Sequence, residues 1–247
     1  NEASTLSAVP NGVTVRAPPE HGGARQPRGG AAAQTPWRTP VKPRPKTFSF
    51  DRVFHHGDSV YEASVRPLVR AVFDGQNGTV LAYGASNSGK TYSIMGGTNY
   101  VGILPRCVSD LFSRAKQLST ADCEYKVSIG YVALHMNEFQ DLLAPTATSA
   151  LTAPVEVVDG GARGGMALKG PSSLRTAVAT AEEAIVVIRQ GNVARAQVRA
   201  TYGTARRAKA HSIVSFYVSA TGRRDGRVSR TTKLHVIDLA GNEEGVG

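Results

Sequence analysis

The strongest chemical signal in the sequence is a glycine-rich loop that fits the pattern G-x-x-x-x-G-K-[ST] at every fixed position. Its residues are Gly84, Ala85, Ser86, Asn87, Ser88, Gly89, Lys90 and Thr91. In such a loop, glycines let backbone N–H groups converge on phosphate oxygens, and the following helix adds the positive end of its dipole. We expect Lys90 to contact the β- and γ-phosphates of a nucleotide, and the Thr91 hydroxyl to bind Mg²⁺. A flexible glycine turn is the alternative, and the strand and helix predicted on either side disfavour it.

A carboxylate at the end of a second strand would complete this chemistry, because Mg²⁺ beside a phosphate-binding loop needs a further acidic partner. The apolar run 234–237 ends in Asp238, and Leu239-Ala240-Gly241 follows. We expect Asp238 to hold Mg²⁺ through a water molecule, and the Gly241 N–H to face the γ-phosphate. Taken alone, a strand-end aspartate is more simply a turn former or a helix cap. The phosphate-binding loop favours the metal role.

Short apolar runs rich in β-branched and aromatic residues predict the strands that position these groups. They cover residues 79–83, 126–136, 212–220 and 228–239. Asp225-Gly226 lies between the last two runs and is a hairpin signal, so we expect these strands to pair antiparallel. Apolar residues recur at helical intervals over Ala177–Gln190, and Gly191 is expected to end that helix. The alternation of helices and strands elsewhere predicts an α/β fold with a mixed sheet.

Composition limits the class of protein. The 247-residue chain is 41% hydrophobic, which is ordinary for a globular protein and excludes wholesale disorder. No apolar run approaches the roughly 18 residues of a membrane-spanning helix, and the first residues lack the pattern of a secretory signal. Cys107 and Cys123 are too few for a disulfide framework, and no Cys/His cluster has zinc-like spacing. We therefore expect a protein of the reducing cytoplasm without membrane insertion.

Charge and proline content divide the chain. The formal net charge of +10 favours a polyanionic partner, and DNA, RNA, an anionic membrane or the acidic surface of a microtubule would each satisfy it. Basic residues are dense over 1–46 and again over 195–233. Residues 1–46 also hold eight of the thirteen prolines, which predicts an irregular N-terminal segment with one short strand near residues 12–16. Residues 47–247 are interpreted as the folded domain.

Further motifs occur in one order along the chain and together resemble the motor domain of kinesins. They are Phe50–Phe54, Val60-Tyr61, Asn77–Gly96, Gly102–Arg106, Asp141–Leu143 and Asp238–Glu243. The resemblance extends over about residues 12–247, and a generic phosphate-loop ATPase would not carry this set. It implies a P-loop NTPase fold, with a central mixed β-sheet flanked by helices on both faces. It also implies a motor domain that uses ATP with Mg²⁺ and binds microtubules.

The resemblance assigns roles to residues outside the glycine-rich loop. In kinesins, a ring after the G-K-T residues packs on adenine, and Tyr92 occupies that position. An Arg-x-Arg-Pro segment covers the other side of adenine in the family, and the nearest match here has Arg16, with Pro18 in place of the second arginine. A glutamate of the second switch pairs with an arginine of the first. Glu243 corresponds to that glutamate, and Lys209 replaces the arginine with a cation that is not bidentate.

The first switch is the segment that departs most from the family, which has the pattern Asn-x-x-Ser-Ser-Arg-Ser-His. Aligned on His211, the corresponding segment begins at Thr204. The family's three serines help to hold Mg²⁺ and the attacking water, and here they are replaced by Arg207, Ala208 and Ala210. Phosphoryl transfer depends mainly on positioning and electrostatics, so these losses should lower hydrolysis more than nucleotide affinity.

Three hypotheses follow. The leading one is a kinesin-like motor domain that couples ATP hydrolysis to microtubule-based movement. The second is a catalytically weak or silent kinesin-like scaffold that binds microtubules, which the altered first switch motivates. The third is a basic nucleic-acid-binding ATPase, although the sequence shows no recognition motif for DNA or RNA. The basic residues of the first switch are Arg206, Arg207 and Lys209, and two interpretations of them stay open. They face the triphosphate or an acidic partner, or they form a solvated surface.

The resemblance also predicts what lies outside this sequence. The chain ends at Gly247, just inside the second switch of the family pattern. We therefore expect this sequence to be a fragment, with much of the microtubule-binding surface, the neck and any dimerisation segment beyond its end.

Overall fold

The computed structural model describes residues 6–9, 12–15, 46–55, 57–135, 137–144, 155–159, 166–169, 174–201 and 210–242. The chain forms two compact units, Asn1–His55 and His56–Gly247. In the first unit, β1 (Leu6–Val9), β2 (Gly12–Val15) and β3 (Lys46–Ser49) form an antiparallel sheet in the order β1-β2-β3. The strand predicted near residues 12–16 is present as β2. The strand β1 (LSAV) was not predicted, because it lacks the run of β-branched residues that marks β2 (GVTV).

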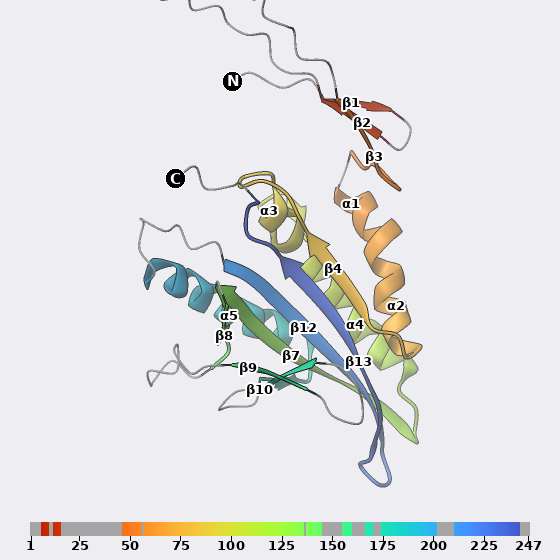
Figure 1. Cartoon of the computed structure of the whole chain (residues 1–247). Coiled ribbons are helices and arrows are strands. Elements are labelled where there is room, and N and C mark those ends of the chain that lie inside the picture. Colours follow the sequence, from red (N-terminus) through yellow and green to blue (C-terminus); the bar gives the residue numbers. More distant parts are fainter. Residues whose placement is uncertain are drawn as a thin grey trace, which may run out of the picture. The chain divides into compact units, whose positions relative to one another are not determined.

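The second unit is built around a mixed sheet in the order β11-β7-β12-β13-β4, with β8 also paired to β7 (Figure 1). Its strands are β4 (Gly78–Ala82), β7 (Cys123–His135), β8 (Glu138–Asp141), β11 (Thr176–Val178), β12 (Ala210–Gly222) and β13 (Val228–Asp238). The strands β13 and β4 are parallel, and the other neighbours are antiparallel. The predicted mixed sheet is therefore confirmed. The parallel pair also brings the ends of β4 and β13 to one edge, with Asp238 opposite Ala82.

The helices of the second unit include a segment of π-helix that joins α1 to α2. They are α1 (Gly57–Val60), the π-helix (Tyr61–Val65), α2 (Arg66–Phe73), α3 (Lys90–Met95), α4 (Ile103–Leu118) and α5 (Ala181–Thr201). Two short antiparallel pairs are also present: β5 (Gly96–Gly97) with β6 (Tyr100–Val101), and β9 (Glu156–Asp159) with β10 (Met166–Lys169). Within the described part of the chain, none of the helices has the length and apolar character needed to cross a membrane.

The core lies between the helices and one face of the sheet. Val214 and Phe216 on β12 are almost fully buried, as are Leu234 and Val236 on β13. These residues belong to one apolar cluster with buried residues of α2, α4 and α5. The register pairs Phe216 with Leu234 and Val214 with Val236. Because side chains alternate between the two faces of a strand, a slip of one residue would remove this whole set from the core.

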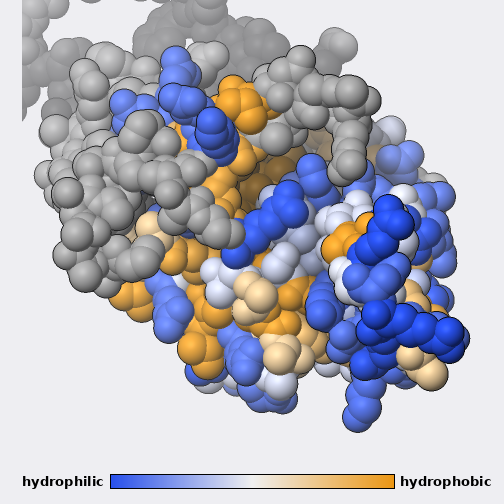
Figure 2. Space-filling view, turned by 90° about the horizontal axis from the view of Figure 1, so that it is seen from below, coloured by the Kyte–Doolittle hydropathy of each residue, from blue (hydrophilic) through white to orange (hydrophobic). Residues whose placement is uncertain are grey.

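The hairpin between β12 and β13 forms where the sequence predicts it. Gly226 adopts a φ of 65°, in the left-handed region that glycine tolerates best. The turn is closed by a hydrogen bond from the Gly222 N–H to the Arg227 carbonyl oxygen, at 2.9 Å. The Asp225 carboxylate accepts a further bond from the Arg227 N–H, at 3.0 Å. Residues 223–231 are exposed, and the view from this end shows a dense group of hydrophilic side chains (Figure 2).

The start of α5 lies later in the chain than the hydrophobic pattern predicts. Residues 176–178 form the strand β11, so the apolar spacing that begins there belongs to two elements. The Thr180 hydroxyl accepts a bond from the Glu183 N–H at 3.2 Å, and the Glu183 carboxylate accepts one from the Ala179 N–H at 2.7 Å. This arrangement is a variant of the capping box, in which the Glu183 carboxylate bonds to the residue before the N-cap, and it fixes the start of the helix at Ala181.

The end of α5 shows that the predicted role of Gly191 was wrong. The helix continues through Gly191 as far as Thr201. A Cβ atom placed on Gly191 would lie 2.2 Å from the ring of Tyr131 on β7. Glycine therefore allows the helix to approach the sheet closely at this point. Tertiary packing outweighs the penalty of about 1 kcal/mol that an interior glycine imposes on a helix.

Candidate functional site

The glycine-rich loop lies between the end of β4 and the start of α3, as the sequence predicts. Gly89, the residue before α3, has a φ of 95°, and Asn87 has a φ of 61°. Both angles are in the left-handed region, where glycine and asparagine are the residues most easily accommodated. These two residues turn the chain sharply from strand to helix. Such a turn brings successive backbone N–H groups together, as phosphate binding requires.

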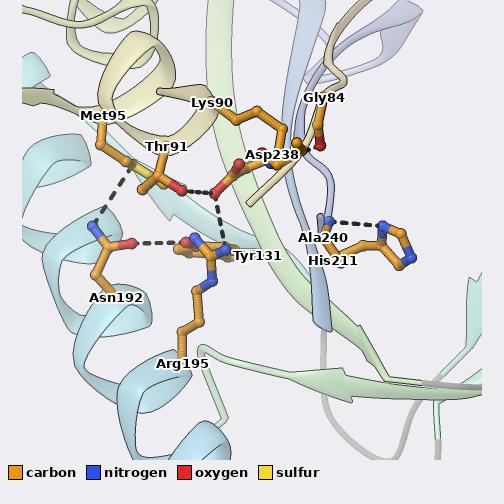
Figure 3. Close-up of polar contacts among 11 residues, drawn as sticks. Gly84, Lys90, Thr91, Met95, Tyr131, Asn192, Arg195, His211, Asp238 and Ala240 are labelled. Carbon is orange, nitrogen blue, oxygen red and sulfur yellow. Dashed lines mark hydrogen bonds and ion pairs between the residues drawn. The ribbon is translucent and has the colours of Figure 1, made fainter. Parts of the chain in front are cut away.

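Lys90 is the first residue of α3, and its side chain lies back across the loop (Figure 3). Its Nζ donates hydrogen bonds to the carbonyl oxygens of Gly84, at 2.9 Å, and Ala85, at 2.6 Å. The Ser88 N–H also donates to the Ala85 carbonyl oxygen, at 3.2 Å. The ammonium group is thus bonded to neutral acceptors, so its positive charge is available to an anion that binds in the loop.

A partly buried polar cluster joins the glycine-rich loop to the end of β13 (Figure 3). The Thr91 hydroxyl donates to Oδ2 of Asp238 at 2.7 Å. Nη2 of Arg195, which projects from α5, lies 2.9 Å from the same oxygen. The Asp238 side chain is 1% exposed and that of Arg195 is 13% exposed. Parts of the chain more than a hundred residues apart therefore meet on one carboxylate.

The second carboxylate oxygen, Oδ1 of Asp238, is buried and has no hydrogen-bond partner among the described residues. A buried carboxylate oxygen without a partner is costly unless a cation or a water molecule satisfies it. Mg²⁺ prefers oxygen ligands and usually retains several of its water molecules. The Thr91 hydroxyl and the Asp238 carboxylate therefore fit Mg²⁺, with Asp238 able to act through a bound water.

Residues of β7 and α5 support this cluster from one side. The Tyr131 hydroxyl donates to Oδ1 of Asn192 at 2.7 Å, and the Asn192 amide lies 3.9 Å from the sulfur of Met95 on α3. Burial raises the pKa of the Tyr131 hydroxyl, so this group remains a proton donor near neutral pH. The contacts link α3, which carries Thr91, to the helix that carries Arg195.

The two predicted switch segments meet at their described ends. Nδ1 of His211, at the start of β12, accepts a hydrogen bond of 3.2 Å from the Ala240 N–H (Figure 3). An imidazole nitrogen that accepts a hydrogen bond carries no proton, which places the proton of the neutral ring on Nε2. Gly241 follows directly and is half-buried. The Asn242 amide donates to the Tyr83 hydroxyl, at the end of β4, at 2.8 Å.

Tyr92, the residue expected to contact adenine, packs on another ring in this structure. Its side chain stacks on Tyr100, with ring centroids 5.2 Å apart and an interplanar angle of 25°. Tyr92 is 52% exposed, so much of its surface remains accessible. The other residues predicted to complete the site lie outside the described residues: Arg16, Pro18, Lys209, Glu243 and the first-switch residues 204–208.

Arg195 is the site residue that the sequence analysis missed. It appeared there only as a basic residue within the charged stretch 195–233. A signal was present, because Ala184, Ile188 and Gly191 are buried on α5, and Arg195 continues that helical spacing. Expecting the helix to end at Gly191 hid this relation. An arginine on the buried face of a helix is stabilised by a carboxylate partner, and Asp238 is that partner.

Comparisons with known proteins agree on one family. A family model of the kinesin motor domain matches residues 27–246. Chromosome-associated kinesin KIF4B of Homo sapiens is 31% identical over 208 residues, which cover 80% of this chain and 16% of that protein. Kinesin-like protein KIN-5A of Arabidopsis thaliana is 31% identical, with coverage of 80% and 20%. Kinesin heavy chain of Neurospora crassa is 32% identical, with coverage of 80% and 21%.

A solved structure supports the same assignment. It is described as the structure of a fast kinesin, and it matches with a TM-score of 0.70 and 30% sequence identity. The match covers 81% of this chain and 56% of that chain. This chain spans only 16 to 21% of the length of the three relatives named above. From the family model, the relatives and the solved structure together, the chain belongs to the kinesin motor domain family.

Proposed function

We propose that this chain is an ATP-binding and microtubule-binding motor domain that couples ATP hydrolysis to microtubule-based movement. The hydrogen bond between Thr91 and Asp238 carries the proposal. It joins the glycine-rich loop to the end of the neighbouring strand, where P-loop enzymes hold the Mg²⁺ of the nucleotide complex. Kinesin motor domains bind ATP with Mg²⁺, and they bind microtubules. The net charge of +10 also suits an acidic polymer, so we infer that the protein acts on microtubules in the cytoplasm.

The present contacts of Lys90 and Thr91 support the roles that we propose for the loop residues. The backbone N–H groups from Gly84 to Gly89 would bind phosphate oxygens. Lys90 would exchange the carbonyl oxygens of Gly84 and Ala85 for the β- and γ-phosphates. Thr91 and Asp238 would hold Mg²⁺, the second through a water molecule. When bound, Mg²⁺ supplies positive charge that stabilises the developing charge on the phosphates.

Arg195 adds a positioning role. Its guanidinium lies on the same oxygen of Asp238 as the Thr91 hydroxyl, and this holds the carboxylate in one orientation. The Gly241 N–H would contact the γ-phosphate, and Lys209 with Glu243 would close the two switches. Tyr92 would pack on adenine, with Arg16 and Pro18 on the other side. For these last six residues the proposal rests on sequence position within the family.

A second candidate function is a microtubule-binding protein of this family that binds ATP but turns it over slowly or not at all. The altered first switch supports it. Ala210 stands at a position where the family pattern has serine, and it is buried at the start of β12, so no hydroxyl is available there. Arg207 and Ala208 replace the other two serines.

The deciding measurement is ATP turnover with and without microtubules, alongside a titration of nucleotide binding. Strong stimulation by microtubules supports the motor. Tight ATP binding without turnover supports the second candidate. The measurement should use the longest natural form of the protein, because this chain spans only part of its relatives.

The Lys90→Ala variant tests the nucleotide site itself. It should abolish ATP binding, because no other described cation contacts the carbonyl oxygens of the loop. Lys116→Ala, an exposed lysine on α4, is the matched control and should retain wild-type affinity. Unchanged ATP affinity in Lys90→Ala would refute the site. Competition between microtubules and DNA or RNA, measured at several salt concentrations, separates both candidates from a nucleic-acid-binding ATPase.

A further inference from the structure

The helices α2 and α4 contact each other in the fold (Figure 1). A separate group of charged side chains lies between them. The side chains facing this space line an open surface hollow of about 170 Å³ that shares no residue with the candidate nucleotide site. Three arginines line it: Arg66 and Arg70, one turn apart on α2, and Arg114 on α4. Since a water molecule occupies about 30 Å³ in the liquid, the hollow has room for a group of several heavy atoms.

One of these arginines is already paired with carboxylates. Nη1 of Arg66 lies 2.6 Å from the Glu62 carboxylate, and its Nε lies 3.3 Å from Oδ2 of Asp110. The Tyr61 hydroxyl donates to the same Asp110 oxygen at 2.8 Å. Burial raises the pKa of the Tyr61 hydroxyl, so this donor keeps its proton. Asp110, which lines the hollow, and Glu62 therefore both have partners, and neither carboxylate pairs with the other two arginines.

Arg70 and Arg114 have no carboxylate within ion-pair distance among the described residues. Nε of Arg114 is buried and makes no hydrogen bond within that part of the chain. The guanidinium carbon of Arg114 lies 5.9 Å from the centroid of the Phe73 ring, which helps to hold the group in place. A buried N–H without a partner is unfavourable, so this guanidinium lacks an acceptor that would offset its burial.

We propose that this hollow binds a small phosphate group, either inorganic phosphate or a small phosphomonoester, through Arg70 and Arg114. A guanidinium presents parallel N–H groups that match two oxygens of a tetrahedral anion. The hydroxyl of Ser113 and the amide of Gln117 also line the hollow and provide neutral donors. The three guanidinium groups outnumber the two carboxylates, those of Glu62 and Asp110, so the site has a net positive charge. Bound phosphate would connect α2 to α4.

The test uses the whole chain carrying Lys90→Ala, so that phosphate bound at the glycine-rich loop does not contribute. The Nε–Hε resonances of the arginines are followed by NMR during titration with inorganic phosphate, phenyl phosphate or acetate at constant ionic strength. The expected result is a saturable shift of the Arg114 resonance with a phosphate probe, and weaker binding of acetate. The phosphate probe that binds more tightly identifies the source of the group. No saturable shift, or binding of acetate as tight as phosphate, overturns the proposal.

Matched variants separate a built site from general positive charge. Arg70→Gln combined with Arg114→Gln should weaken phosphate binding by at least about tenfold, because both free guanidinium groups are lost. Arg189→Gln removes one exposed charge on α5 and should change the affinity less than about twofold. Equal weakening in both cases would overturn the proposal. If the double variant does not fold, the Arg114 resonance of the parent chain decides the question.

Discussion

The two ends of the β12–β13 pair carry the same kinds of charged side chain in opposite surroundings. At the carboxyl end of β13, Asp238 pairs with Arg195 at 2.9 Å, and the side chains are 1% and 13% exposed. At the hairpin end, Arg224 pairs with Asp122 at 3.2 Å, and these side chains are 89% and 75% exposed. The distances are similar, but water surrounds only the second pair. Burial, more than distance, therefore decides what each pair does for the protein.

The difference has a functional meaning. In the buried pair, solvent cannot screen the charges, so Arg195 holds the Asp238 carboxylate where Thr91 also reaches it. The carboxyl end of β13 therefore offers the fixed geometry that catalysis needs. The hairpin end keeps its charges in water, where they contribute little to stability. It can still attract an acidic partner over a distance of about one Debye length.

The largest expected effect is at the buried pair. Arg195→Ala leaves the Asp238 charge buried without its partner, so the free energy of unfolding should fall by about 3–5 kcal/mol. Urea denaturation measures this change. Arg189→Ala, on the exposed face of the same helix, is the control and should change stability by less than about 0.5 kcal/mol. Similar losses in the two variants would mean that burial of the arginine does not decide the size of the loss.

A smaller effect is expected where α5 crosses β7. Gly191→Ala should destabilise by about 1–3 kcal/mol, because its Cβ would lie 2.2 Å from the Tyr131 ring. Gly226→Ala is the comparison at the hairpin end, where nothing lies within 4 Å of the added atom and only the left-handed φ opposes it. Combining Gly191→Ala with Tyr131→Leu should recover part of the loss in urea denaturation. A stabilising Gly191→Ala would show that helix propensity outweighs packing.

The middle of β13 gives a smaller, pH-dependent effect. Burial, with a contribution from Lys233, lowers the pKa of His235 below its ordinary value of 6.5. As pH falls below 6.5, the unfolded chain therefore binds a proton more readily than the folded chain, and the free energy of unfolding should decrease. Urea denaturation between about pH 7.5 and 5.5 measures the slope.

The His235→Gln variant is the control for that slope. It should reduce the dependence on pH in this window, since glutamine does not titrate. Glutamine can also hydrogen-bond to Ser215, whose hydroxyl lies 2.8 Å from Nδ1 of His235. An identical slope in the variant would assign the dependence to other groups.

The smallest effect is expected at the exposed pair. Arg224→Ala should lower the free energy of unfolding by less than about 0.5 kcal/mol, and added salt should remove even that difference. The same variant should weaken binding to microtubules at low salt if the hairpin end attracts an acidic partner. A stability loss close to that of Arg195→Ala would contradict the comparison.

Local patterns account for what could be predicted from the sequence. The glycine-rich loop, the β12–β13 hairpin and the strand ending in Asp238 each depend on residues close together in the chain, so spacing alone revealed them. The predicted end of α5 failed for the opposite reason. Gly191 looks like a helix end locally, and only the nearby ring of Tyr131 explains why glycine stands inside a helix.

The sequence by itself determined the family, the mixed sheet and the loop that carries Lys90 and Thr91. Only the tertiary structure decided which groups meet, such as Arg195 with Asp238, or Arg70 and Arg114 around one hollow. The physical reason is the range of the interactions. Turns, strands and loops follow from steric and hydrogen-bonding preferences of neighbouring residues. A buried ion pair or an unpaired guanidinium depends on which distant segments exclude water together.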